Sequence, residues 1–124
     1  AARAYPEECC GLIEGVREGE ICRALALHAT RNVASNPRVN FEIDPQIHFQ
    51  LARALRGSGR DIIGCYHSHP DGAPAPSRVD RDSAAEDGFF WLIAAGNPRA
   101  GFALKPYIFW EVAGFVDAVL TTVP

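Results

Sequence analysis

The chain contains 124 residues, of which 48% are hydrophobic and 22% are charged, and its formal net charge is -3. This length suits one core, so we expect residues 1–124 to form a single domain. The weak negative charge argues against nucleic acid as the main partner. No apolar run approaches the ~20 residues that cross a bilayer. The chain starts without Met or a signal-peptide pattern, and we expect it to begin part-way through an incomplete first helix.

Apolar or alternating runs bounded by turn residues predict the strands of a sheet. They cover residues 9–16, 21–28, 41–43, 61–68, 89–95, 103–110 and 114–121. The first two runs flank Gly19, which suits a tight hairpin turn. Strands mixed with helices predict an α/β fold, a twisted mixed sheet with two or three helices packed on it.

Two segments between the strands carry helix signals. Asp44 and Pro45 are typical of an N-cap and first helical residue, and apolar residues at helical spacing continue to Leu55. Ser77 predicts the start of a polar helix of about ten residues that Gly88 ends. The Asn-rich segment 30–40 and the Pro-rich segment 71–76 predict loops.

The chemistry gathers at the end of the strand predicted over 61–68. Because strand side chains alternate, His67 and His69 project together, roughly 6 to 7 Å apart along the strand. Asp80 follows in the first turn of the next helix. Two imidazoles and a carboxylate are the ligands of a zinc site with an open fourth position, and the open position holds a water activated near pH 7. Such a water needs a general base, for which composition alone leaves these glutamates open: Glu7, Glu8, Glu14, Glu42 and Glu86.

Each part of this site has a plainer interpretation. Ser77 and Asp80 also form a capping-box pattern that closes a helix N-terminus. His28 and His48 are predicted to be structural or surface residues. A purely structural zinc site would close its fourth position, and Asp71 is the residue that could do so.

The cysteines do not predict a disulfide framework. Two of them are adjacent, Cys9 and Cys10, while Cys22 and Cys65 lie singly inside apolar runs. Half-buried thiols of this kind behave as small hydrophobes. A reducing, cytoplasmic location therefore fits best, and the missing Cys-x-x-Cys pair argues against a thiolate zinc site.

Two motifs carry a resemblance to a known family. The chain reads His67-Ser68-His69-Pro70, then six residues, then Ser77-Arg78-Val79-Asp80; upstream it reads Pro6-Glu7-Glu8-Cys9-Cys10-Gly11. Together these resemble the JAMM (MPN-plus) metallopeptidases, in particular stand-alone bacterial members that trim sulfur-carrier proteins. The similarity runs from about Pro6 to Ile93.

The resemblance implies a cytidine-deaminase-like α/β fold, with Zn2+ bound by His67, His69 and Asp80. It makes Glu8, rather than Glu7, the catalytic base that moves a proton from water to the leaving amine. It gives Ser77 a role in steadying the oxyanion.

The resemblance also implies the substrate, a peptide or isopeptide bond after the Gly-Gly tail of a ubiquitin-like sulfur-carrier protein. We expect an extended tail to add as a strand beside the 30–40 loop. A catalytically inactive scaffold that binds a ubiquitin-like partner is the alternative. The functional positions of the family motifs are all filled in this chain, which argues against that alternative. A zinc deaminase would need His-x-Glu and Cys-x-x-Cys, which this chain lacks.

Overall fold

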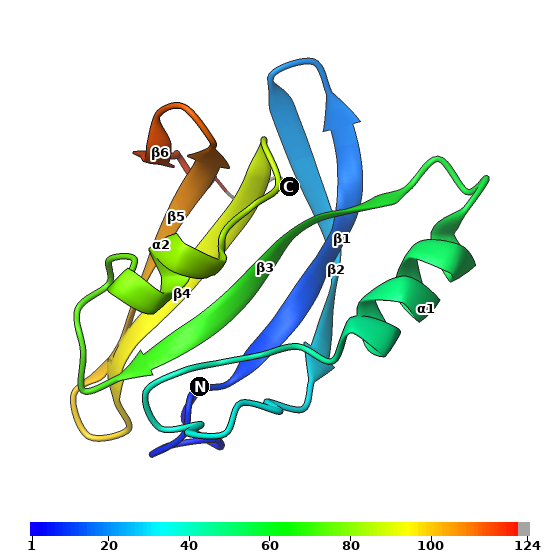
Figure 1. Ribbon diagram of the computed structural model, residues 1–124. Coiled ribbons are helices and arrows are strands. Elements are labelled where there is room, and N and C mark those ends of the chain that lie inside the picture. The colour runs from blue at the N-terminus through cyan, green and yellow to red at the C-terminus, as the bar shows by residue number, and fades with distance from the viewer. Residues whose placement is uncertain (122–124) are drawn as a thin grey trace.

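The computed structural model describes residues 1–121, and one mixed sheet forms its centre (Figure 1). Its strands are β1 (Cys10–Glu18), β2 (Ile21–Thr30), β3 (Asp61–Pro70), β4 (Phe89–Asn97), β5 (Gly101–Trp110) and β6 (Gly114–Asp117). The strand order is β2-β1-β3-β4-β5-β6. Strands β3 and β4 run parallel, and the other neighbours run antiparallel. The expected mixed α/β fold is confirmed.

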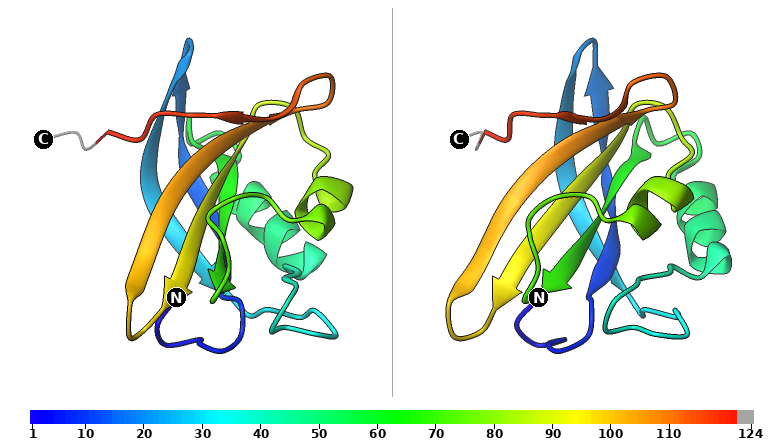
Figure 2. Two further views of the ribbon diagram at one scale, coloured as in Figure 1. Left: turned by 90° about the vertical axis from the view of Figure 1, so that its left-hand side faces the viewer. Right: turned by 60° about the vertical axis from the view of Figure 1, so that its left-hand side comes forward.

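The helices α1 (Pro45–Leu55) and α2 (Arg78–Ser83) lie on the same face of the sheet (Figure 2). Helix α2 belongs to the crossover that a parallel pair such as β3 and β4 requires. As predicted, Asp44 caps α1, accepting a hydrogen bond from the Gln46 N–H, and Pro45 follows it. Neither helix has the length and apolarity that crossing a bilayer takes.

The core lies between the sheet and the helices. Strand alternation puts the large apolar side chains of β1, β3, β4 and β5 on this face, and a register shift between β1 and β3 brings Ile62 to the same side as Cys65. They are Leu12, Ile62, Cys65, Phe89, Trp91, Ile93, Tyr107 and Phe109, with Leu51 and Leu55 of α1 packed against them. Burying a side chain of this size stabilises the fold by about 1.5–3 kcal/mol. Trp91 makes an edge contact with the His67 ring at 5.7 Å, so the core ends where the predicted site begins.

The strand expected at residues 41–43 is not present. The segment makes one isolated bridge, between Asn32 and Ile43. The neighbouring Glu42 N–H is bound by the side chain of Asn32, and Phe41 turns inward onto His67. Side-chain contacts therefore replace the ladder that the short alternation predicted.

Two other elements are shorter than expected. Helix α2 ends at Ser83, whose hydroxyl donates to the Asp80 carbonyl, and Ala84 is already extended. The strand expected over 114–121 ends at Asp117. Ala118 N–H still donates to the Pro106 carbonyl, but Pro106 has no N–H to return the bond. At the other end of the chain, residues 2–6 form turns where we expected the remainder of a helix.

Candidate active site

The two histidines lie where β3 ends, in the middle of the sheet. Strand β1 flanks them on one side, with Cys10 opposite His67, and β4 flanks them on the other. The predicted alternation holds, since both rings project to the helix-covered face. Their Nε2 atoms lie 2.9 Å apart, with His67 fully buried and His69 9% exposed.

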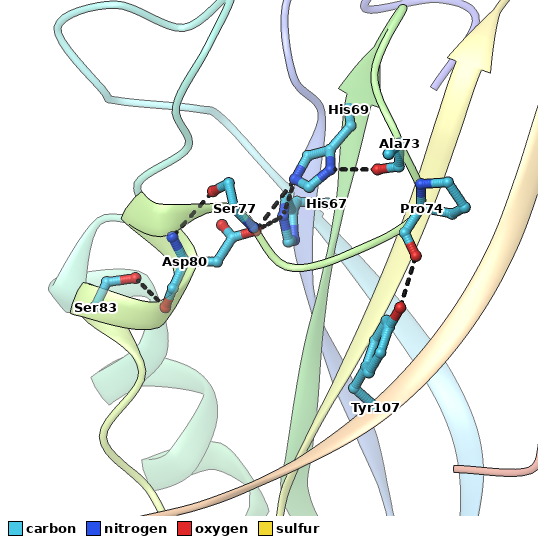
Figure 3. A network of polar contacts seen from close by, with 8 residues as sticks. All are labelled: His67, His69, Ala73, Pro74, Ser77, Asp80, Ser83 and Tyr107. Carbon is cyan, nitrogen blue, oxygen red and sulfur yellow. Dashed lines mark hydrogen bonds and ion pairs between the residues drawn. The ribbon is translucent and has the colours of Figure 1, made fainter. Parts of the chain in front are cut away.

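Asp80 reaches the same point from the first turn of α2 (Figure 3). Its Oδ2 lies 3.1 Å from each histidine Nε2 and accepts a hydrogen bond from the Ser77 N–H at 2.9 Å. The Ser77 Oγ in turn accepts the Asp80 N–H at 3.1 Å, so the predicted capping box is present. Burial acts to raise the pKa of Asp80, but hydrogen bonds with His67 and His69 hold it well below its ordinary value.

These three side chains fit a metal ion. Their ligand atoms form a triangle with sides of 2.9, 3.1 and 3.1 Å. In a tetrahedral site with bonds of ~2.0–2.1 Å, neighbouring ligand atoms lie roughly 3.3 Å apart. Two imidazoles that direct their Nε2 atoms at one another and at a carboxylate oxygen form a donor set suited to a cation.

The loop between β3 and α2 fixes the tautomer of His69. The Nδ1 of this ring lies 2.9 Å from the Ala73 carbonyl and donates to it, so the neutral ring carries its lone pair on Nε2, the atom that faces His67 and Asp80. The next residue, Pro74, is held in turn by the hydroxyl of Tyr107 on β5, which donates to its carbonyl at 2.7 Å (Figure 3). A side chain of the core thus orients a candidate metal ligand through two loop carbonyls.

His67 is oriented by packing instead. Its ring stacks on Phe41 with centroids 4.2 Å apart and planes at 19°. The buried Nδ1 of His67 has no hydrogen-bond partner among residues 1–121. Burial lowers the pKa of this ring, although Asp80 acts in the opposite direction. The low pKa favours the neutral imidazole that a metal requires.

Glu8 lies beside the histidines, two residues before β1 begins. One oxygen of its carboxylate and one ring nitrogen from each of His67 and His69 all lie within 4.8 Å of one another. The side chain is buried, whereas Glu7 is exposed. Burial raises the pKa of Glu8 from 4.5 to about 7, while His69 acts to lower it. A carboxylate that titrates near neutrality is well suited to accept and return a proton.

The other acidic candidates lie elsewhere. Glu14 is engaged by His28 and Arg60, at 2.8 and 2.7 Å. Asp71, considered above as a fourth ligand, accepts hydrogen bonds from Tyr5 and the side chain of Asn97. Glu42 and Glu86 are exposed. Among the candidate bases, Glu8 is the one that shares a cluster with the histidines.

Sequence reasoning missed Phe41 and Tyr107. The alternating pattern predicts Phe41 in one strand and the apolar pattern places Tyr107 in another, and neither residue carries a local signal of contact with the site. The residues that they contact are distant in the sequence, so periodicity could not reveal either role.

Comparisons with known proteins identify the family of this chain. The family described as prokaryotic homologs of the JAB domain matches residues 1–111. The chain belongs to this family. The resemblance to JAMM-type peptidases is thereby confirmed, and with it the expectation of a hydrolase.

Two named relatives each match more than half of the chain. The chain is 37% identical over 99 residues to the desampylase of Haloferax volcanii, covering 80% of this chain and 70% of that protein. It is 36% identical over 78 residues to a probable TtuB-protein conjugate cleaving protease of Thermus thermophilus, covering 63% of this chain but only 49% of that protein.

A solved structure shares the fold. The solution structure of a protein from Desulfitobacterium hafniense superposes with a TM-score of 0.79 at 26% identity. The superposition covers 95% of this chain and 80% of the other. The shared arrangement of strands and helices therefore extends over nearly the whole chain.

Proposed function

We propose that this chain is a zinc-dependent peptidase that hydrolyses the bond after the Gly-Gly tail of a ubiquitin-like sulfur-carrier protein. The observation that carries the proposal is the convergence of Glu8 with His67, His69 and Asp80 at the end of β3. In support, one relative is named for cleaving conjugates of the protein TtuB. The four cysteines are free thiols, which fits the reducing cytoplasm that belongs to this proposal.

His67, His69 and Asp80 would hold the metal, each through one atom. A zinc ion bound there supplies a Lewis acid and lowers the pKa of an attacking water. The ligands are prepared for this task because Asp80 is ionised and both Nε2 atoms face the common point.

Glu8 accepts a proton from the attacking water and then delivers it to the nitrogen of the leaving amine. Its burial favours the protonated state that this second transfer needs. The same carboxyl can therefore act as base and acid in one turnover.

Ser77 has a hydroxyl available for a second role. Its Oγ accepts the Asp80 N–H, yet a hydroxyl has one donor and two acceptor sites. The remaining O–H can donate to the oxyanion of the tetrahedral intermediate. The capping and catalytic interpretations of Ser77 are thus compatible.

A cleft of about 590 Å³ borders Glu8 and offers room for part of the substrate. Its walls come from the chain before β1 and from the segment after β2, including Arg31, Val33 and Pro37. This is the segment where we expected an extended tail to bind. Because Glu8 lines the cleft, a chain bound there passes the proposed base.

The test is cleavage of a ubiquitin-like carrier that ends in Gly-Gly-Cys, followed by mass spectrometry. We expect release of cysteine, loss of cleavage on removal of the metal with a chelator, and recovery on addition of Zn2+. A matched carrier ending in Ala-Ala-Cys should be cut poorly. Stoichiometric zinc without cleavage of any Gly-Gly carrier or Gly-Gly-linked conjugate would favour the inactive scaffold instead.

A further inference from the structure

Glu8 lies outside regular structure, so its position depends on contacts made by its own backbone. The Glu8 N–H donates to the Pro37 carbonyl at 2.7 Å. The Glu8 carbonyl accepts a hydrogen bond from Asn32 Nδ2 at 2.9 Å. On the following residue, the Cys9 N–H donates to the hydroxyl of the buried Ser68, on β3 between the two histidines, at 2.7 Å.

Asn32 stands at the centre of these contacts. Its Nδ2 donates to the carbonyls of Glu8 and Asn40, both at 2.9 Å. Its Oδ1 accepts the N–H groups of Ala34 and Glu42, at 3.0 and 3.1 Å. The two ends of one amide therefore bind the segment that carries Glu8 and the loop that follows β2.

The same amide also determines where Phe41 lies. Asn40 and Glu42 flank Phe41, and both are bound by Asn32 through their backbones. Phe41 stacks on the ring of His67. The buried Nδ1 of this ring has no hydrogen-bond partner among residues 1–121, so the stacking contact matters for its orientation. One side chain thus links the proposed base to the packing of a candidate metal ligand.

We propose that Asn32 is a positioning residue of this enzyme, whose amide holds Glu8 and Phe41 in register with the metal-binding histidines. The inference rests on the proposed function of Glu8. Asn suits the task because the amide at the end of its short side chain offers both N–H donors and an oxygen acceptor. Asp offers acceptors alone at the same position.

The substitution Asn32→Asp separates these functions. It keeps an oxygen for the Ala34 and Glu42 N–H groups, but it replaces the donor with an oxygen that faces the Glu8 and Asn40 carbonyls. A small misplacement of a catalytic group costs on the order of 100-fold in rate. We therefore expect kcat on the Gly-Gly-Cys carrier to fall roughly 10- to 100-fold, while KM and zinc content change little.

The control is Gln50→Glu, the same amide-to-carboxylate change outside the proposed substrate cleft. Gln50 lies on α1 and is exposed, and its side chain makes no hydrogen bond within the described part of the chain. This variant should cleave at the rate of the unaltered protein. Equal activity of the Asn32→Asp and Gln50→Glu variants would overturn the inference.

A double-mutant cycle separates positioning of Glu8 from a general effect on folding. If Asn32 acts through Glu8, adding Asn32→Asp to a Glu8→Gln variant should leave the residual rate unchanged. A further loss by the same factor as in the unaltered background would show a general structural effect and would contradict the proposal.

Hydrogen exchange supplies a readout that does not need activity. We expect the backbone amides of Glu8 and Cys9 to exchange faster in Asn32→Asp than in Gln50→Glu, with the exchange of β3 unchanged. Unchanged exchange at Glu8 would overturn the inference even if the carrier is cleaved. If the unaltered protein cleaves no Gly-Gly substrate, the proposed function fails, and exchange still decides whether Asn32 fixes this segment.

Discussion

Two buried glutamates six positions apart in the sequence, Glu8 and Glu14, have opposite surroundings. Each is 5% exposed and each lies near histidine. Glu14 binds Arg60 and His28, and these hydrogen bonds lower its pKa. Glu8 has no Lys or Arg ion-pair partner among residues 1–121, and burial raises its pKa to about 7. Glu14 belongs to a charge-balanced ion pair, whereas Glu8 is left able to exchange a proton.

The same contrast separates the histidines. His28 contacts Glu14 from the edge strand β2, and its side chain is 37% exposed. His67 and His69 are enclosed between β1 and β4 and direct both Nε2 atoms at Asp80. Shared residue types thus yield an ion pair in one place and a candidate metal centre in the other.

The largest effect is expected from His67→Asn compared with His28→Asn. Loss of a residue that only supports a metal ligand lowers metal affinity roughly 10- to 100-fold. Loss of the ligand itself should therefore lower zinc affinity by more than about 100-fold. Elemental analysis should find zinc missing from the His67 variant, together with all cleavage. The His28 variant should retain both. An unchanged zinc content in the His67 variant would show that this ring is not a metal ligand.

Next in size is Glu8→Gln compared with Glu14→Gln. Removal of a general base costs about 10²- to 10⁴-fold. We expect kcat of the Glu8 variant to fall by this factor with zinc content unchanged, because Glu8 is not among the three proposed ligands. The Glu14 variant should lose stability and keep its turnover. Normal turnover by the Glu8→Gln protein would refute its assignment as base.

The third prediction concerns stability in the metal-free protein. The raised pKa of Glu8 means that its ionisation opposes folding. This cost is absent below pH 4.5, grows between 4.5 and about 7, and is complete above that range. Glu8→Gln should therefore raise the free energy of unfolding by about 3 kcal/mol at about pH 8, and by little at about pH 5.

Urea titrations at about pH 5 and about pH 8 measure both variants, and Glu14→Gln should show the opposite sign to Glu8→Gln. Its lowered pKa stabilises the fold above the ordinary carboxyl pKa, and this contribution disappears as the pH falls through the folded-state pKa. The substitution should destabilise the protein at about pH 8 and do so less in acid. Parallel pH profiles for the two variants would contradict the contrast between them.

The smallest effect is expected from Tyr107→Phe. Loss of the hydrogen bond to Pro74 should cost about 1 kcal/mol of stability and roughly 10-fold in zinc affinity, because the loop also carries Ala73, the partner of His69. Competition with a zinc-binding dye measures the affinity. Arg60→Gln, which removes the ion pair with Glu14, should leave the zinc affinity unchanged. Equal zinc affinities would mean that the loop needs no support from Tyr107.

Much of the fold and the proposed metal ligands followed from local rules. Alternation along β3 places His67 and His69 on one face, and the cap of α2 directs Asp80 inward; both rules act within a single element. The base was different, because composition left five glutamates open and only the family motif selected Glu8. The absent strand at 41–43 and the shortened α2 show where local patterns yielded to side-chain hydrogen bonds.

Local sequence specifies which residue types lie on which face of each element, because those directions depend on neighbours along the chain. Which faces meet depends on the long-range packing of the elements. Pairing of β1 with β3 sets Cys10 opposite His67 and so brings Glu8 to the histidines. The loop after β2 folds around Asn32 to the same point, and Tyr107 reaches it from β5. These contacts join residues far apart in the chain, and no local spacing encodes them.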